Sequence, residues 1–283
     1  MRRSRSGEAP GRAGGGDNAA AAHAGDLWRQ GDDAPEKIRR ELAVEAAIGL
    51  AYDSRPYVVV MGSPLDIEDL AIGFTVTERI AAFADIARVT VSRTDEGILA
   101  DILLSPAASR SMSLARRRTL EARSSCGLCG VESLKQAIRP MAPVGLGPSV
   151  SRAAIQSALA ALEASQTLGA LTRATHAAAW AEASGTLRLV REDVGRHNAL
   201  DKLVGAALRA GLDPREAFVI VTSRCSYEMV EKTAAAGVAL LVAISAPTDL
   251  AIRQAETAGM TLVALARGDG HCVFTGADRI TGP

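Results

Sequence analysis

The residues of this sequence best suited to chemistry are two cysteines three positions apart. They lie in the run Ser124-Ser125-Cys126-Gly127-Leu128-Cys129-Gly130, directly before a predicted helix over 131–138. The positive end of a helix dipole favours the thiolate form of nearby cysteines. A thiolate in a glycine-containing loop can attack a donor persulfide, hold its outer sulfur and move that sulfur to an acceptor. The loop is therefore a candidate site for sulfur transfer.

Three other interpretations of the cysteine pair are open on spacing alone. A structural zinc needs two further soft ligands at similar spacing, whereas Cys225 and Cys272 are isolated in the sequence. A thioredoxin-like exchanger needs the pair directly after a strand, but here the pair follows an irregular basic run. Burial of the cysteines in a core is disfavoured by the Ser, Arg and Gly residues around them. The sequence predicts no metal site.

Composition limits the class of protein. The chain has 283 residues, with 32 basic and 32 acidic side chains, which argues against non-specific nucleic acid as a partner. No apolar stretch of about 18 residues runs without a charge or a helix breaker, so no membrane span is expected. The first residues contain no apolar segment typical of a secretory signal. Four cysteines are too few for a disulfide scaffold. We expect a soluble, cytoplasmic protein.

Two domains are expected behind a disordered tail. Residues 1–25 are rich in Gly, Ala, Arg and Ser and cannot offset their ordering entropy by burial. Residues 26–148 are expected to form an α+β domain that carries the cysteine loop. Prolines and glycines in 141–148 suggest a linker, and residues 149–283 are expected to form an α/β domain.

The N-terminal domain contains one strand-then-helix signal and one hairpin signal. A β-branched run at 57–61 is followed by Ser63 and Pro64, predicted as the N-cap and first turn of a helix with Ile67 and Phe74 on its apolar face. Apolar runs at 87–92 and 98–104 flank Asp-Glu-Gly and predict the hairpin.

The C-terminal domain shows strands that alternate with helices. A helix is predicted from Ser151 to about Leu168, and a second carries Leu200, Leu203, Val204, Ala207 and Leu208 on one face. The ends of three helices are predicted from glycines that follow them: Gly211, Gly237 and Gly259. The predicted strands are 187–190, 218–222, 240–244 and 261–264.

Four long polar segments add a resemblance to a known family. Besides the cysteine loop, these segments are Gly62–Phe74, Thr175–Trp180, Arg191–Leu203 and Ser226–Lys232. Together they resemble the formate dehydrogenase accessory sulfurtransferases, the FdhD family, in motif order and over roughly Glu45 to Ile280.

The resemblance implies a fold, a reaction and partners. The fold implied is a cytidine-deaminase-like α/β C-terminal domain after a smaller mixed α+β domain, in a homodimer. The activity implied is that of a sulfurtransferase: a cysteine desulfurase donates sulfur as a cysteine persulfide. The acceptor is the molybdenum cofactor, bis-molybdopterin guanine dinucleotide, destined for formate dehydrogenase, and a GDP-like nucleotide is a mimic of it. Deaminase chemistry is not expected, because the Cys pair precedes the histidine segment and His176 is followed by alanines.

The resemblance also assigns residues. Cys126 carries the persulfide, and Cys129 is its helper. The cofactor-binding stretch carries over onto Leu265, Ala266, Arg267, Gly268, Asp269 and Gly270. A glycine-containing turn after a strand lets backbone N–H groups approach a phosphate, and Arg267 adds a charged fork. Asp269 departs from this logic, since a carboxylate repels phosphate unless it faces a guanine or its ribose.

Other polar residues have a functional and a structural interpretation side by side. Asp193, Arg196 and His197 either contact the cofactor at a helix N-terminus or serve as a cap and an Arg196–Glu192 pair. Arg224 and Ser226 precede another such helix. His176 either orients a ligand or is a hydrogen-bonded core residue. Cys225 is predicted as a buried filler, and the arginines 116–118 as a solvated basic face or a docking surface.

A hypothesis of a different class is a binding chaperone. Such a protein shields the molybdenum cofactor or binds a guanine nucleotide without sulfur chemistry. It keeps cofactor binding and enzyme maturation after both thiols of the loop are removed, which distinguishes it from a sulfur carrier.

Overall fold

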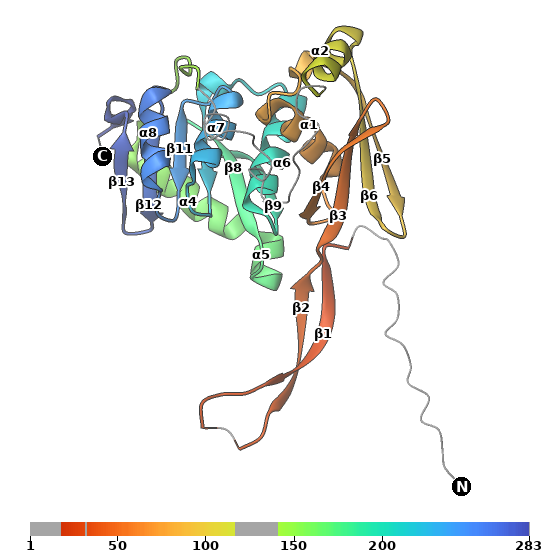
Figure 1. Cartoon of the computed structure of the whole chain (residues 1–283). Helices are drawn as coiled ribbons and strands as arrows, with labels where there is room; N and C mark the ends of the chain where they lie inside the picture. Colours follow the sequence, from red (N-terminus) through yellow and green to blue (C-terminus); the bar gives the residue numbers. More distant parts are fainter. Residues whose placement is uncertain (1–17, 32, 117–140, 283) are drawn as a thin grey trace.

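The computed structural model describes residues 18–31, 33–116 and 141–282, and these form a mixed α/β fold with several sheets (Figure 1). The N-terminal half is built on a four-stranded sheet in the order β4-β3-β6-β5. Its strands are β3 (Ala46–Tyr52), β4 (Arg55–Gly62), β5 (Ile86–Thr94) and β6 (Gly97–Leu104). The predicted hairpin is confirmed, since β5 and β6 pair antiparallel.

Helix α1 (Ile67–Thr77) packs on this sheet through the alternating apolar residues of β3 and β6. Its start differs from the prediction. The N-cap is Asp66, in the left-handed region at φ 53°, and Ser63 instead donates its backbone N–H to Asp193 in the other half of the chain. The helix therefore begins later than the Ser-Pro signal indicates, because a long-range contact occupies Ser63. Helix α2 (Pro106–Arg116) follows β6.

A two-stranded hairpin precedes this sheet. Strands β1 (Ala20–Leu27) and β2 (Glu36–Ala43) pair antiparallel over their whole length and extend away from the body (Figure 1). The prediction of a disordered tail over residues 1–25 is thus wrong for residues 20–25, which lie in β1. Residues 1–17 lie outside the part of the chain that the structure describes. Ala19 and Ala20 are buried against Leu168, so even small side chains have a surface to cover here.

The C-terminal half is a six-stranded sheet in the order β13-β12-β11-β10-β8-β9. Strands β10, β11 and β12 run parallel, and β8 runs antiparallel between β9 and β10. The strands are β8 (His176–Glu182), β9 (Leu187–Asp193), β10 (Ala217–Val221), β11 (Leu240–Ala243), β12 (Thr261–Arg267) and β13 (Gly270–Thr275). All four predicted strands are confirmed, and the sequence interpretation missed β8 and β13.

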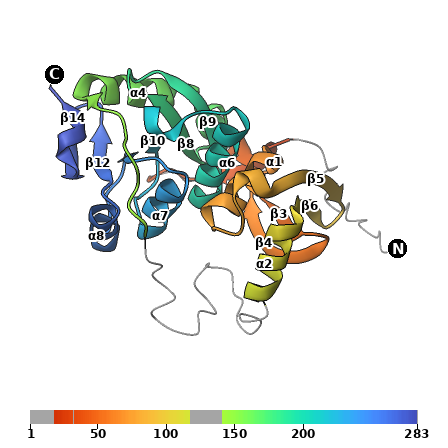
Figure 2. The same ribbon diagram turned by 90° about the horizontal axis from the view of Figure 1, so that it is seen from above.

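Helices cover both faces of this sheet (Figure 2). On one face α4 (Arg152–Ser165) packs over Phe218 and Val242, and the short α5 (Thr167–Thr172) follows it. On the other face lie α6 (Arg196–Arg209), α7 (Tyr227–Ala235) and α8 (Asp249–Thr257). Short strands β7 (Val150–Ser151) and β14 (Ile280–Thr281) pair beside the sheet.

The predicted glycine ends are confirmed at all three helices. Gly211, Gly237 and Gly259 have φ of 66°, 80° and 66°, the left-handed conformation that ends a helix at low cost in glycine. At the other ends, Ser151 and Thr248 cap α4 and α8 with side-chain hydrogen bonds. Residues 141–148, the predicted linker, form neither helix nor strand.

The two halves meet where α1 crosses α6 with almost no space between the backbones. A Cβ atom added at Gly73 would overlap the carbonyl oxygen of Asp201, and one added at Gly205 would overlap that of Asp69. The two glycines thus allow an approach that any side chain would prevent. This contact fixes the N-terminal half against the start of α6.

Candidate functional site: a cationic sheet edge

One edge of the six-stranded sheet gathers polar residues from several elements. Strands β9, β10, β11 and β12 all end at this edge, and β8 begins there because it runs in the opposite direction. Helices α6, α7 and α8 start from the same edge, so their positive dipole ends point the same way. In sheets of this kind the crevice beyond the strand ends is the usual ligand site.

Asp193, the last residue of β9, has a structural role at this edge. Its side chain is fully buried and accepts hydrogen bonds from the N–H groups of Ser63 at 3.0 Å and Gly195 at 2.7 Å. It also lies 2.6 Å from Lys202 Nζ, which donates to the Ser63 carbonyl at 3.0 Å. Asn198 completes the group by donating to Met61 O. These bonds tie the end of β4 to the first turns of α6.

The predicted Arg196–Glu192 pair does not form. Glu192 instead accepts from the backbone N–H groups of Leu168 and Gly169, at 2.9 and 2.7 Å, at the start of α5. Arg196 has no ion pair within the described ranges, and its Nε is buried without an acceptor there. The charge of Arg196 nevertheless acts on Glu228, whose pKa it helps to lower.

His197 and Glu228 connect the first turns of α6 and α7. His197 Nε2 lies 2.9 Å from Glu228 Oε2, and Ser226 Oγ lies 3.3 Å from the same carboxylate oxygen. The pKa of Glu228 is lowered, first by the hydrogen bond from His197 and against the effect of burial. The carboxylate is thus held charged and already engaged.

His176 lies at the start of β8, opposite Asp193 of β9. The pKa of His176 is lowered, chiefly by burial and then by the nearby charges of Arg196, His197 and Arg224. These effects place four basic side chains from β8, α6 and the β10–α7 loop close together. A group of buried or clustered charges that shifts a histidine toward its neutral form is typical of a functional site.

The stretch from Leu265 to Gly270 contains the predicted glycine-containing turn, at Gly268 and Asp269, but strand β12 extends to Arg267 before the turn and β13 begins at Gly270. Arg267 pairs with Gly270 across the turn, and Arg267, Gly268 and Asp269 are exposed. Leu265 has a left-handed φ of 54° and is 41% exposed, whereas Ala266 is buried in the core. The hairpin turn can thus present Arg267 and backbone N–H groups, while the Ala266 side chain faces the protein.

The cysteine pair lies outside the described residues. Cys126, Cys129, the predicted helix over 131–138 and the arginines 117 and 118 all fall there, so their assignments stay predictions. Met141, the next described residue, is buried, and Val144 N–H donates to Ala258 O at the end of α8. Of the other cysteines, Cys225 is fully buried and burial raises the pKa of its thiol to about 12. The prediction of a buried filler is confirmed.

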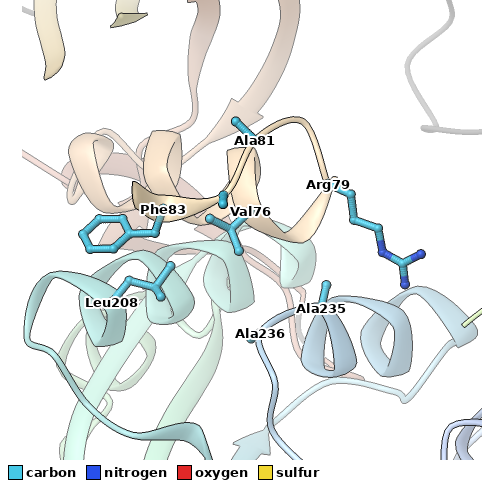
Figure 3. Close-up of a pocket in the computed structure, with 8 residues that line it drawn as sticks. Val76, Arg79, Ala81, Phe83, Leu208, Ala235 and Ala236 are labelled. Atoms are coloured by element: carbon cyan, nitrogen blue, oxygen red, sulfur yellow. The ribbon is translucent and has the colours of Figure 1, made fainter. Parts of the chain in front are cut away.

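A cavity of about 400 Å³ lies away from the polar edge, at the C-terminal ends of α1, α6 and α7 (Figure 3). It is lined mainly by apolar side chains, among them Val76, Phe83, Leu208 and Ala235, with Arg79 at its rim. None of the predicted site residues in the described part lines it. We therefore do not assign the expected sulfur-transfer chemistry to this cavity.

The sequence interpretation missed a set of ionic contacts between the two halves. Lys232 on α7 lies 2.9 Å from Asp201 and 2.8 Å from Glu78, beyond α1. Asp69 on α1 binds both Arg191 at 2.8 Å and Arg209 at 2.6 Å. All but Glu78 and Arg209 fall in the polar motifs quoted above, so the unusual density of charged residues in those motifs was the available signal.

No described helix combines the length and apolar character needed to cross a membrane. Within 18–31, 33–116 and 141–282, no three His, Cys, Asp or Glu side chains gather into a group that could hold a metal ion.

Comparison with known proteins identifies the family. The FdhD/NarQ family profile matches residues 43–281. A protein of Bordetella petrii named sulfur carrier protein FdhD is 42% identical over 240 residues, covering 84% of this chain and 86% of that one. Proteins of the same name from Cupriavidus necator and Xanthomonas euvesicatoria are 43% and 45% identical and cover 89% and 86% of this chain and 87% and 86% of their own.

The fold also matches a solved structure. The crystal structure of a protein assigned as a formate dehydrogenase accessory protein from Desulfotalea psychrophila superposes with a TM-score of 0.73 at 22% identity, covering 93% of this chain and all of that one. The likeness extends over both halves of the molecule. With the profile match and relatives above 40% identity over most of their length, this chain belongs to the FdhD/NarQ family.

Proposed function

We propose that this protein is a sulfur carrier that accepts sulfur as a persulfide on Cys126 and transfers it to the molybdenum cofactor of a formate dehydrogenase. The observation that carries the proposal is the Cys126-Gly127-Leu128-Cys129 loop in a chain whose relatives, at 42–45% identity, are named sulfur carrier proteins. The Desulfotalea protein, named as a formate dehydrogenase accessory protein, supports the choice of recipient enzyme.

The loading step is a thiol exchange. The Cys126 thiolate attacks the outer sulfur of a persulfide on a cysteine desulfurase, an S–S bond forms to Cys126, and the desulfurase thiolate leaves with the bonding electron pair. Within the described residues, Cys225 is buried with a raised pKa and does not suit this reaction. Cys129 is proposed as the helper thiol that relays or protects the sulfur.

The acceptor is bis-molybdopterin guanine dinucleotide, bound as a substrate and then passed on. The proposed cofactor-binding stretch is Leu265 to Gly270, which lies at the same sheet edge as the basic cluster of His176, Arg196 and Arg224. The exposed Arg267 and the backbone of the turn can reach a phosphate. A concentration of positive charge beyond strand ends is a suitable place for the phosphates of a dinucleotide.

Further parts of the proposal concern fold, assembly and compartment. The order β9-β8-β10-β11-β12, with β8 antiparallel and helices on both faces, supports a cytidine-deaminase-like C-terminal domain. We also propose a homodimer that works in the cytoplasm with a cysteine desulfurase as donor and formate dehydrogenase as recipient.

The experiment separates sulfur transfer from the alternative of a cofactor chaperone. The purified protein is incubated with a cysteine desulfurase and cysteine, and the loop peptide is examined by mass spectrometry for a gain of one sulfur. Formate dehydrogenase activity is measured in a strain that carries only Cys126→Ala. We expect loading of the wild type and loss of activity in the variant without loss of folded protein, because the substitution removes the proposed sulfur-carrying thiol and is not expected to open a cavity in the core. Wild-type activity in Cys126→Ala and in the variant without both loop thiols would establish the chaperone instead.

A further inference from the structure

The cavity at the C-terminal ends of α1, α6 and α7 offers an apolar surface to a partner. Its volume is about 400 Å³, and seven of the eight residues that line it are apolar. Phe83 is 38% exposed, and Figure 3 shows it with Val76 on the α1 side, facing Leu208 of α6. A cavity with this lining suits an apolar side chain, the kind of anchor that dominates protein–protein contacts.

The helix ends around the cavity do not need a polar ligand. The carbonyl oxygen of Val76 accepts from Arg79 N–H at 3.0 Å, and that of Leu208 accepts from Gly211 N–H at 3.1 Å. The carbonyl oxygen of Ala234 on α7 is bonded in the same way, by an N–H group three residues further on. These bonds satisfy main-chain acceptors that a bound polar group would otherwise have to meet.

The described parts of the chain on either side of the Cys126 stretch are attached next to this cavity. Before that stretch, α2 starts beside the 3₁₀ turn η1 (Phe83–Asp85), where the Ser105 N–H group and hydroxyl donate to the Asp85 carbonyl and carboxylate, both at 2.7 Å. After it, Met141 is buried and Val144 N–H donates to Ala258 O at the end of α8, at 2.9 Å.

The two attachments lie on opposite sides of the cavity. Phe83 of η1 belongs to its lining, and so does Ala235 at the end of α7. Helices α7 and α8 pack against each other, so the end of α8 lies about 10 Å from the end of α7. A donor that must reach Cys126 therefore meets the cavity between the two points where the chain that carries this cysteine is fixed.

The rim of the cavity is basic. Arg79 is exposed and has a left-handed φ of 56°, a conformation that costs free energy in any residue with a side chain. Helices α6, α7 and α8 have glycine at the corresponding position. Helix α2 adds the exposed Arg110 and contains no acidic residue. Glu78, beside Arg79, is engaged by Lys232 at 2.8 Å. The rim thus complements carboxylates on a partner.

Docking at the cavity leaves the cofactor edge of the sheet accessible. Helices α6, α7 and α8 start at the edge where the parallel strands end, so the cavity at their C-terminal ends lies on the opposite side. The 14 residues of α6 separate the two places by about 21 Å. A partner at the cavity and a cofactor at the strand ends therefore do not compete for the same surface.

We propose that this cavity is the docking site of the sulfur donor, the cysteine desulfurase, which inserts an apolar side chain flanked by a carboxylate. The inference rests on the proposed function and names the surface that its donor uses. The apolar side chain packs between Phe83 and Leu208, and the carboxylate pairs with Arg79 at the rim. Formate dehydrogenase, the recipient, is the competing occupant and forms a separate arm of the test.

The test compares two donors on the full-length protein. Loading of Cys126 is measured by the mass of the loop peptide at increasing concentrations of the desulfurase with cysteine, and separately with glutathione persulfide. In the second reaction the Cys126 thiolate attacks the outer sulfur and glutathione leaves as its thiolate, so no docking surface is needed. Binding of formate dehydrogenase is measured in parallel by biolayer interferometry.

Each cavity variant has a matched control on α5. Arg79→Glu is compared with Arg173→Glu, because Arg173 is also exposed and has the same φ of 56° at a helix end. Phe83→Ala is compared with Leu171→Ala, because Leu171 is likewise a large exposed apolar residue. Neither control residue lines the cavity.

We expect the desulfurase concentration for half-maximal loading to rise about tenfold or more in Phe83→Ala and Arg79→Glu, and to stay at the wild-type value in both controls. Glutathione persulfide should load all of these proteins equally. Wild-type dependence on the desulfurase in both cavity variants would overturn the inference and leave the proposed function intact.

Three other results would also overturn the inference. If a cavity variant loses loading by glutathione persulfide as well, the defect lies in the thiol and not in docking. If the cavity variants bind formate dehydrogenase more weakly while desulfurase loading is unchanged, the cavity takes the recipient. If neither donor loads the wild type, the proposed sulfur carriage fails, and the docking site of its donor fails with it.

Discussion

Replacing Lys202 by methionine tests how far the contact between the two halves depends on its buried ion pair. Lys202 Nζ lies 2.6 Å from Asp193 Oδ2, and both side chains are 0% exposed. Methionine is an unbranched side chain of similar length, so the packing volume changes little. The variant leaves the Asp193 carboxylate buried with only the neutral N–H donors of Ser63, Gly195 and Asn198. Removal of one partner of a buried pair costs about 3–5 kcal/mol.

The assay is the free energy of unfolding from urea denaturation, together with the midpoint of thermal unfolding. A loss of this size corresponds to a fall in Tm of roughly 6–20 °C for a chain of this length. Lys37→Met is the matched control, because Lys37 pairs with Asp26 at the surface, where the side chains are 83% and 45% exposed. Such a pair contributes about 0–1 kcal/mol.

A double variant makes the test sharper. Asp193→Asn combined with Lys202→Met removes both charges and should be more stable than Lys202→Met alone, because no uncompensated carboxylate stays buried. The reasoning is refuted if Lys202→Met costs no more than Lys37→Met. It is equally refuted if the double variant is less stable than Lys202→Met.

Three further variants test the buried thiol of Cys225 and the turn between β12 and β13. Cys225→Ala should leave formate dehydrogenase maturation unchanged and lower the free energy of unfolding by about 1 kcal/mol, because the buried side chain of Cys225 only fills the core. Loss of maturation with normal solubility would show that this thiol is functional. Arg267→Ala should weaken GDP binding by about 1.5–3 kcal/mol, tenfold or more, without affecting persulfide loading of Cys126. Gly268→Val should fold normally, since a Cβ atom at this position meets no atom within 4 Å. Any loss of GDP affinity in this variant therefore reports contact with the ligand. Unchanged GDP affinity in both Arg267→Ala and Gly268→Val would remove the stretch Leu265–Gly270 from the site.

Local signals in the sequence predicted much of the C-terminal half. The apolar runs that became β10 to β12 are buried on both faces of the sheet, and Gly211, Gly237 and Gly259 end their helices in the expected conformation. These features depend on residues close together in the chain, so propensity and periodicity suffice to find them. The cysteine loop and the polar motifs likewise indicated the family through residue types and motif order alone.

Elements whose local preference conflicts with their surroundings were missed. Strand β8 contains Ala177, Ala178 and Ala179, and alanine favours helix, yet these residues are buried between β9 and β10. Ser63 has the signature of an N-cap, but its N–H bonds to Asp193, 130 residues away. In both cases a long-range contact outweighs the local preference, and periodicity in one short window carries no information about it.

The sequence by itself determined which residues can do chemistry: a cysteine pair in a glycine-containing loop, and basic side chains before predicted helices. Only the tertiary structure decided how those residues are used. The reversal of β8 brings His176 to the edge where α6 and α7 begin, and there the charges of Arg196 and Arg224 help to lower its pKa. Asp193 and Lys202, equally polar in the sequence, are withdrawn from that edge, because their charges satisfy each other in the buried contact with the N-terminal half.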